Sequence, residues 1–371
     1  MHPLDYKGCI FNALREVECM NVVEQYNLTL QIEVLKEQSA ETLARLCNLV
    51  EGSGTSDCVE LLKAYSHIVN TELYLATSIH ELDILKSDMV KLENTIKESL
   101  AQASHDISDI KETGDVQAIE SYSSEDFDKA LERTIDFLTF NKNISSTPRA
   151  VILGGQSGAG KTTIHRVKML ESKGNYIVID GDTYRAQHSY FRELQEKYGV
   201  NSVDYTKMFA GKMVEAVIDK LSSLKYNLII EGTLRSAAVP INTATLLKSK
   251  GYTVDFCLIA TKPELSYLTT QLRYLEMMIV DPLQARATPK DHHDGIVKSL
   301  VSNSNELEQS GLFESIQVYK RDLEQVYNSK LSTESVGTVV DKILFGPWTS
   351  DEYALLEVSK SQEQELREKL P

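Results

Sequence analysis

The segment from Gly155 to Thr162, GQSGAGKT, fits the spacing G-x-x-x-x-G-K-T and has a third glycine, Gly158, inside it. In such a loop the backbone N–H groups surround phosphates, the lysine reaches the β and γ oxygens, and the last hydroxyl binds Mg2+. No N-K-x-D guanine motif follows, which favours ATP over GTP. The spacing therefore predicts Mg2+ on Thr162 and ATP on Gly155, Gln156, Ser157, Gly158, Ala159, Gly160, Lys161, Thr162 and Thr163.

A carboxylate, Asp182, follows the next apolar run of the chain, in the segment IDGDTYR. A carboxylate at the end of the strand after a phosphate loop can take a proton from an acceptor hydroxyl. Asp182 lies beyond the apolar run and is better placed for this role than Asp180. The alternative is that Asp182 caps the following helix or binds magnesium through water.

Three polar residues, Glu231, Thr233 and Arg235, alternate at the end of a third apolar run, NLIIEGTLR. They suit the hydroxyls and charges of a substrate, although a solvated strand end has the same pattern. Glu215 lies on an amphipathic stretch and its side chain could point toward the site or toward solvent.

Two arginines, Arg273 in TTQLRYLE and Arg286 in DPLQARATP, are candidates for binding the transferred phosphate. Phosphoryl transfer needs positive charge around the equatorial oxygens, and arginine supplies it with a rigid donor fork. Taken singly, each arginine has the alternative of a helix-surface role.

The elements that must position these residues alternate between strands and helices after residue 145. Short, nearly continuous apolar strands separated by helices predict a parallel sheet with helices on both faces, and its ligands gather at the carboxyl ends of the strands. The expected helices include 205–224 and 263–280, and the expected strands are 150–155, 176–182, 227–232, 254–261 and 315–321.

The first 118 residues have a different pattern and a different charge. They carry 20 acidic and 9 basic side chains, against 34 and 30 in the remainder. Apolar residues at helical spacing from Leu28 to Val50 predict a first helix, which ends at the segment GSGTSD. A second periodic region covers 59–100 and has a plausible break near 76–80. These patterns predict a small three-helix bundle over 1–100, a linker over 101–118, and an α/β domain over 119–371.

Composition excludes several classes of protein. A net charge of -15 argues against a nucleic-acid binder, which needs clustered Lys and Arg. No apolar run approaches the roughly 18 to 20 residues of a membrane span, and the first residues lack the order of a secretory signal, so a cytoplasmic location is expected. The 5 cysteines show no CxxC or Cys/His cluster, which supports neither zinc nor a disulfide framework.

Several motifs together resemble the zeta toxins of the Pez type, from the bacterial epsilon/zeta toxin-antitoxin systems. The resemblance covers about 119–348 and rests on GGQSGAGKTTIHR, IDGDTYRAQH, YTKMFAGKMVEA, LIIEGTLR, LIATKPELSYL and QARATPKDHHD. It implies an ATP-dependent kinase that phosphorylates the 3'-hydroxyl of the N-acetylglucosamine unit of UDP-N-acetylglucosamine, which blocks cell-wall precursor synthesis. It further implies that Lys161 and Thr162 bind ATP and magnesium, that Asp182 is the base, that Arg273 and Arg286 bind the transferring phosphate, and that the substrate pocket contains Glu215, Glu231, Thr233 and Arg235.

The helical front, over about 22–99, resembles the toxin-masking part of the matching antitoxin, on the segments EQYNLTLQIEVLKEQSAETLARL and NTELYLATSIHELDILKSDMVKLE. The resemblance implies that these helices cover the ATP site, in cis or from a second copy of the chain. A flexible linker of 18 residues would span roughly 23 Å, which makes docking in cis feasible. Two other functions stay open from the residues alone: a kinase of another small metabolite, and a non-catalytic protein whose partner binding is gated by nucleotide.

Overall fold

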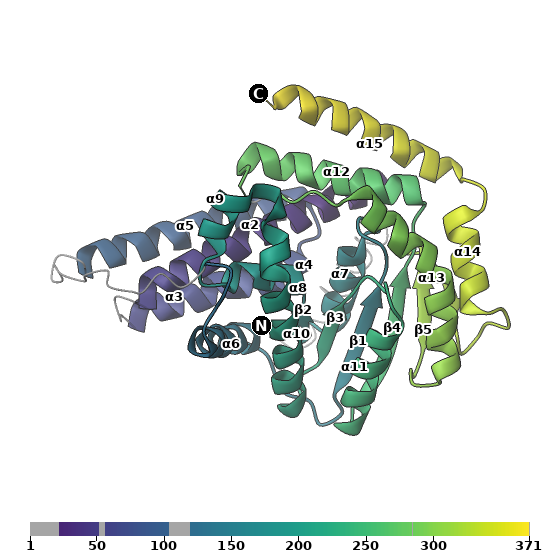
Figure 1. The fold of residues 1–371 in the computed structure, drawn as a ribbon, viewed down its shortest axis with the longest axis horizontal. Helices are drawn as coiled ribbons and strands as arrows, with labels where there is room; N and C mark the ends of the chain where they lie inside the picture. Colours follow the sequence, from purple (N-terminus) through teal and green to yellow (C-terminus); the bar gives the residue numbers. More distant parts are fainter. Residues whose placement is uncertain (1–21, 52–55, 104–118, 284, 371) are drawn as a thin grey trace, which may run out of the picture.

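The computed structural model describes residues 22–51, 56–103, 119–283 and 285–370 (Figure 1). The predicted linker, 101–118, lies for the most part outside the described residues, except for the end of α5. None of the described helices combines the length and the apolar character that crossing a membrane requires. Cys47, Cys58 and Cys257 are buried free thiols.

The N-terminal region is entirely helical in its described part. It consists of α2 (Val22–Glu51), α3 (Ser56–His67), the π-helical turn η1 (Ile68–Glu72), α4 (Leu73–Leu75) and α5 (Ile79–Ala103). The predicted break near 76–80 is confirmed, because the chain leaves the helix at Ala76, where ψ is 127°. Leu28, Ile32, Leu46 and their neighbours on α3 and α5 form the core of this bundle.

A six-stranded sheet forms the centre of the C-terminal region, in the order β2-β3-β1-β4-β5-β6. Its strands are β1 (Arg149–Gly154), β2 (Ile177–Ile179), β3 (Leu228–Glu231), β4 (Thr253–Ile259), β5 (Ile316–Tyr319) and β6 (Gln325–Asn328). The five predicted strands are confirmed and pair in parallel. A sixth strand that the sequence analysis does not predict, β6, turns back after β5 and pairs with it antiparallel at one edge of the sheet.

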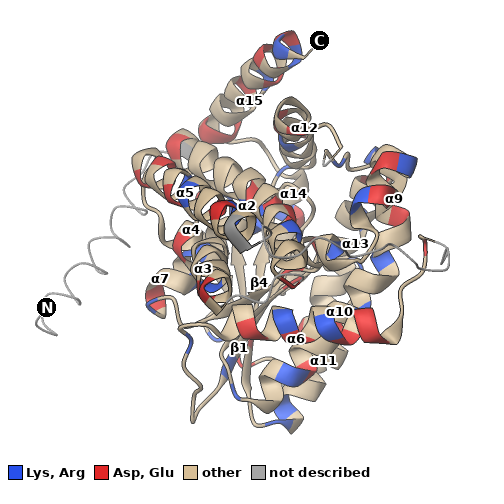
Figure 2. Ribbon diagram, turned by 90° about the vertical axis from the view of Figure 1, so that its left-hand side faces the viewer, with Lys and Arg blue, Asp and Glu red and all other residues tan. Residues whose placement is uncertain are grey.

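Helices cover both faces of this sheet, as predicted. The helices of the C-terminal region are α6 (Ser124–Thr139), α7 (Lys161–Glu171), α8 (Gly181–Tyr184), α9 (Phe191–Tyr198), α10 (Val203–Ser223), α11 (Ala238–Ser249), α12 (Pro263–Val280), α13 (Lys290–Ser310), α14 (Val336–Phe345) and α15 (Ser350–Lys369), with short 3-10 turns η3 (Arg185–Gln187) and η4 (Gly199–Ser202). Figure 2 shows both signs of charge on α9, α10 and α15.

Alternate residues of β1 enter two separate cores, as the pleat of a strand requires. Ala150 and Ile152 face the larger core, which α10, α11, α13 and α14 complete. Val151 and Leu153 face a second core that contains residues of α7 and also Tyr74 of α4. The N-terminal helices thus contribute to a core of the C-terminal sheet.

The first half of α2 packs in a groove between α12 and α15. Tyr26, Leu30 and Val34 of α2 share an apolar cluster with residues of both helices, including Leu268 and Leu355. The polar face beside this stripe points at the loop between β1 and α7. The packing of α2 therefore fixes which charged side chains meet that loop.

Candidate active site

The turn from β1 into α7 forms the phosphate-binding loop, and it holds all nine residues predicted to bind nucleotide. Gly155 and Gly158 have φ angles of +145° and +73°, which L side chains rarely adopt. A Cβ at Gly155 would lie 2.5 Å from the Ile259 carbonyl oxygen, and one at Gly158 would lie 2.1 Å from that of Ser266. Only glycine fits at both positions, so the loop packs closely on β4 and α12.

Lys161 and Thr162 begin α7, with their side chains buried. The Lys161 ammonium lies 3.4 Å from the Gly155 carbonyl oxygen and 3.5 Å from a carboxylate oxygen of Glu231. The Thr162 hydroxyl donates to Glu33 of α2 over 2.8 Å. Both groups that the sequence predicts to bind phosphate and metal thus face carboxylates of the protein.

The two predicted arginines, Arg273 and Arg286, both contact Glu37 of α2. Arg273, on α12, has its guanidinium 3.4 Å from one oxygen of Glu37, and Arg286 contacts the other oxygen over 2.9 Å. The charge of Glu37 has the largest effect on Arg273 and raises its pKa above the usual range. Burial opposes this increase, and the charge of Glu33 adds to it. The structure brings both arginines together around a single carboxylate.

Asp182 lies on α8, just past the end of β2. Its carboxylate accepts a hydrogen bond from Arg185 over 2.9 Å and lies 3.7 Å from Arg286. Its surroundings oppose ionisation through desolvation, but Arg286 and Arg185 outweigh this and hold the pKa of Asp182 below its usual value. Asp182 is therefore an ionised carboxylate at neutral pH and can accept a proton.

Asp180 and Glu231, at the ends of β2 and β3, form a buried acidic pair beneath α2. Lys36 of α2 contacts Asp180 over 2.7 Å, and this carboxylate overcomes the effect of burial and raises the pKa of Lys36 well above its usual value. Burial, together with the charge of Asp180, raises the pKa of Glu231 to about 7. Lys36 from α2 and Lys161 from the loop therefore compensate part of the negative charge of this edge.

A cavity of about 400 Å³ lies on the β3 side of the loop. Its lining includes Glu231, Thr233 and Arg235, as predicted for a substrate pocket, together with apolar residues such as Phe256. Arg235 is exposed at this position. Glu215 is exposed on α10 and is not among the residues that line this cavity.

A much smaller cavity, about 80 Å³, remains between α2 and the phosphate-binding loop. Its walls include Lys161, Thr162, Asp182 and Arg273 from the loop side, and Glu33 and its neighbours from α2. A volume of this size holds a few water molecules and not a triphosphate.

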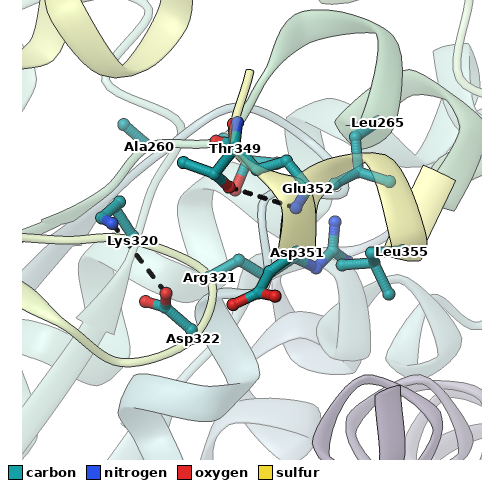
Figure 3. Close-up of a pocket in the computed structure, with 10 residues that line it drawn as sticks. Ala260, Leu265, Lys320, Arg321, Asp322, Thr349, Asp351, Glu352 and Leu355 are labelled. Carbon is teal, nitrogen blue, oxygen red and sulfur yellow. Dashed lines mark hydrogen bonds and ion pairs between the residues drawn. The ribbon is translucent and has the colours of Figure 1, made fainter. Parts of the chain in front are cut away.

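A third cavity, about 30 Å³, lies beyond the loop on the β4 side (Figure 3). Figure 3 shows Arg321, from the turn after β5, beside Asp351 in the first turn of α15. The ring of Tyr26 on α2 has its centre 4.6 Å from the guanidinium carbon of Arg321. The helix α2 therefore extends over this end of the site as well.

Several residues of the site are not predicted from the sequence. Arg185 lies in the motif IDGDTYR, but nothing in the motif shows that its side chain contacts Asp182. The α2 residues Glu33, Lys36 and Glu37 carried a signal, because charged residues recur at helical spacing beside the apolar stripe. In the part of the chain that the structure describes, no three His, Cys, Asp or Glu side chains come together to hold a metal.

The loop between β1 and α7, a carboxylate past β2 and two arginines together define a protein of the P-loop kinase class. Residues 133–332 match the family model described as zeta toxin, and residues 24–99 match that of bacterial epsilon antitoxin. The chain belongs to the zeta toxin family and carries an antitoxin-like region in front of the toxin.

Individual relatives agree with this assignment. The chain is 55% identical to "Toxin PezT" of Streptococcus pneumoniae serotype 4, over 68% of this chain and 99% of that protein. It is 41% identical to "Toxin zeta" of Streptococcus pyogenes, over 59% of this chain and 76% of that protein. A solved structure from the characterisation of the PezAT chromosomal toxin-antitoxin system of Streptococcus pneumoniae superposes with a TM-score of 0.64 and 52% identity, covering 67% of this chain and 100% of that one.

Proposed function

We propose that the chain is a toxin kinase that transfers the γ-phosphoryl group of ATP to the 3'-hydroxyl of the N-acetylglucosamine unit of UDP-N-acetylglucosamine, in the cytoplasm. We further propose that its own N-terminal helices keep the ATP site closed. The observation that carries both proposals is the arrangement around α2. Glu33 and Glu37 fill the space between Thr162, Arg273 and Arg286, which are the groups that a triphosphate would contact.

In the proposed reaction Asp182 accepts the proton of the sugar hydroxyl as its oxygen attacks the γ-phosphorus, and ADP leaves. Arg273 and Arg286 offset the charge on the equatorial oxygens, while Lys161 holds the β and γ phosphates. Mg2+ would be held by the Thr162 hydroxyl and would neutralise phosphate charge. Thr233 and Arg235 bind the acceptor in the adjoining cavity. The family resemblance also assigns Glu215 to the acceptor, although Glu215 lies outside this cavity.

In the proposed closed state, the carboxylates of α2 and the phosphates of ATP compete for the same hydrogen-bond donors and cations. Glu33 accepts the Thr162 hydrogen bond, and Glu37 lies between both arginines. Buried carboxylates that are each matched by a cation or donor are stable, whereas removal of either partner leaves a buried charge uncompensated. A triphosphate must displace both carboxylates to bind.

The covalent link between the two regions strengthens this competition. A linker of the 18 residues 101–118 keeps the N-terminal helices at an effective concentration on the order of millimolar near the ATP site. A modest interface is therefore sufficient to hold the kinase closed. An exchange of the N-terminal helices between two copies of the chain would use the same contacts.

The direct test is mass spectrometry of UDP-N-acetylglucosamine after incubation with ATP and Mg2+. A chain that begins at Ile119 is expected to add one phosphate to the sugar, and the full chain is expected to do so at least about 100-fold more slowly. Equal rates would rule out inhibition by the N-terminal helices.

A screen of other hydroxyl compounds separates the alternatives. If the shortened chain phosphorylates another metabolite and leaves UDP-N-acetylglucosamine unchanged, the assignment of the acceptor is wrong. If it binds ATP and phosphorylates nothing, the protein is a nucleotide-gated binding protein.

A further inference from the structure

One face of the C-terminal sheet is completed by the N-terminal region. We propose that the surface formed by this face and α7 is a second binding site for the N-terminal helices. It binds the segment Leu73–Ala76 at the end of α4 and holds the helices in place when nucleotide displaces α2. The statement about nucleotide rests on the proposed function, whereas the binding surface itself does not.

The first argument is the composition of the second core. It unites Val151 and Leu153 of β1, Ile229 of β3 and Met169 of α7 with Tyr74 of α4. Leu75 packs against the same cluster. The preceding residue, Leu73, belongs instead to the core of the N-terminal bundle. The end of this helix is therefore shared between the two cores.

The second argument is the burial of Tyr74. Only 2% of its surface is exposed, and its ring meets His165 of α7 edge to face, with 5.5 Å between ring centres. Burial, partly offset by Lys36, raises the pKa of Tyr74 to about 12, so the phenol is neutral. A fully desolvated aromatic side chain at the centre of an interface is the usual form of a binding hot spot.

The third argument is a polar contact beside Tyr74. Arg166 of α7 is fully buried, and its guanidinium donates to the Ala76 carbonyl oxygen over 2.6 Å. The last carbonyls of a helix lack partners within the helix and carry partial negative charge, so they suit a cation. Since Ala76 ends the helical run from Ser56, Arg166 recognises the end of that run and fixes its position on α7.

Close backbone packing completes the surface. Gly174 follows α7 with a φ angle of +76°, and a Cβ there would lie 3.0 Å from a methyl carbon of Thr71. The π-helical turn that contains Thr71 immediately precedes α4. Such turns insert an extra residue into a helix and are frequent at functional sites. The surface therefore fits this segment through shape, an aromatic side chain and a helix end.

The surface is distinct from the triphosphate contacts. No residue of the segment Leu73–Ala76 lines the cavity at the phosphate-binding loop. The link between the two sites is Lys36 of α2, whose ammonium lies 5.4 Å from the centre of the Tyr74 ring. Phosphates that compete with Glu33 and Glu37 consequently leave the contacts of Tyr74 and Arg166 in place.

The test uses the full chain with a protease recognition sequence placed within 104–118 and cleaved after folding. The dissociation constant of the two halves is measured by dilution, without nucleotide. Tyr74→Ala is expected to raise it at least about 10-fold, because a hot-spot ring is lost. Tyr74→Phe keeps the ring and is expected to stay within about threefold. If Tyr74→Ala and Tyr74→Phe bind equally well, the second site does not exist.

A second arm adds a non-hydrolysable ATP analogue with Mg2+. Tyr26→Ala is a truncation of equal size in the contact between α2 and α12. Without nucleotide both variants are expected to raise the dissociation constant of the two halves, whereas with the analogue bound only Tyr74→Ala is expected to raise it. Equal effects of the two variants with nucleotide bound would overturn the proposal that this surface holds the helices.

Amide exchange on the unaltered chain serves as the measurement that needs no substitution. With the analogue bound, amides of Glu33–Glu37 are expected to lose protection while those of Leu73–Ala76 keep it. Simultaneous loss at both segments contradicts the second site. If the analogue binds neither the unaltered chain nor the variant Glu33→Ala with Glu37→Ala, the proposed ATP site fails, and the cleaved chain without nucleotide still decides whether the surface exists.

Discussion

The two sides of the phosphate-binding loop differ in what occupies them. On the loop itself α2 leaves a cavity of about 80 Å³, while the adjoining acceptor side keeps one of about 400 Å³. The larger cavity is lined by residues between Ile152 and Phe256, all of them from the C-terminal region. In the proposed function, this difference means that the N-terminal helices exclude ATP and leave the acceptor cavity open.

The chemistry of the two sides explains why only one of them is blocked by α2. The loop side presents cations and a hydroxyl, and α2 matches them with Glu33 and Glu37. The acceptor side is largely apolar, and its polar groups include Glu231, Thr233 and Arg235. A helix with acidic residues at helical spacing is complementary to the first surface and not to the second.

The largest expected effect is the loss of the proposed base, which would leave both sides able to bind and unable to react. In the chain that begins at Ile119, Asp182→Asn should lower the rate of sugar phosphorylation about 1,000-fold, since a positioned proton acceptor contributes roughly 10² to 10⁴. ATP affinity, measured by calorimetry, should change less than about threefold. An unchanged turnover would remove Asp182 from this role.

The second-largest effect is expected on ATP affinity when the α2 carboxylates at the loop are removed. In the full chain, Glu33→Ala combined with Glu37→Ala should raise ATP affinity about 100-fold, because two competing carboxylates are removed. Affinity for UDP-N-acetylglucosamine should stay within about threefold. The control is Glu60→Ala with Glu98→Ala, which removes the same charge from exposed positions. If the control raises ATP affinity equally, long-range charge and not site occupation explains the block.

A smaller effect is expected on the acceptor side. Arg235→Ala should weaken binding of UDP-N-acetylglucosamine about 10-fold, since a single charge-assisted contact is lost, and leave ATP binding unchanged. Calorimetry with each ligand separates the two. Glu215→Ala, made in parallel, tests whether the acceptor extends to α10. A loss of ATP affinity in Arg235→Ala would show that the two sides are not independent.

A separate effect, on stability and not on ligand binding, concerns Glu231, which lines both cavities. Its pKa rises from 4.5 to about 7 on folding, through burial and Asp180, so the native state keeps a proton that the unfolded state releases. The free energy of unfolding should therefore fall as pH rises from about 4.5 to about 7, by at most about 1.4 kcal/mol per pH unit from this group.

Chemical denaturation of Glu231→Gln and of the unaltered chain measures this contribution as a difference. The difference should change across that pH window and be constant above it. The exposed Glu60→Gln serves as the matched control. A difference that is independent of pH would mean that Glu231 is ionised in the folded protein.

Much of the fold and site could be predicted because the signals are local. The phosphate-binding loop is a contiguous motif, and the five parallel strands are apolar runs. The edge strand β6 is not predicted because it has only 4 residues, of which Tyr327 alone is buried. Arg286 lies in an irregular segment between α12 and α13, so no helix or strand periodicity predicts that its side chain meets the same carboxylate as Arg273.

The contacts between the two regions could not be predicted from the sequence. The apolar stripe of α2 marks the face toward its own bundle, and no local pattern shows what lies opposite Glu33 or Glu37. Tyr74 is a single aromatic residue in NTELYLA, and the π-helical turn before it shifts the helix so that spacing alone misplaces its neighbours. Interfaces of this kind depend on surfaces far apart in the chain.

The position of α2 ahead of β1 in the chain has a consequence for synthesis. A ribosome completes α2 through α5 before it begins the sheet, and the residues from 119 to 371 follow over roughly 10 to 50 s. Each toxin-like domain is therefore made with one antitoxin-like region already present, in a fixed ratio of one to one. If these helices inhibit as proposed, the ratio of toxin to inhibitor is set by the chain itself and does not depend on the expression of two separate genes.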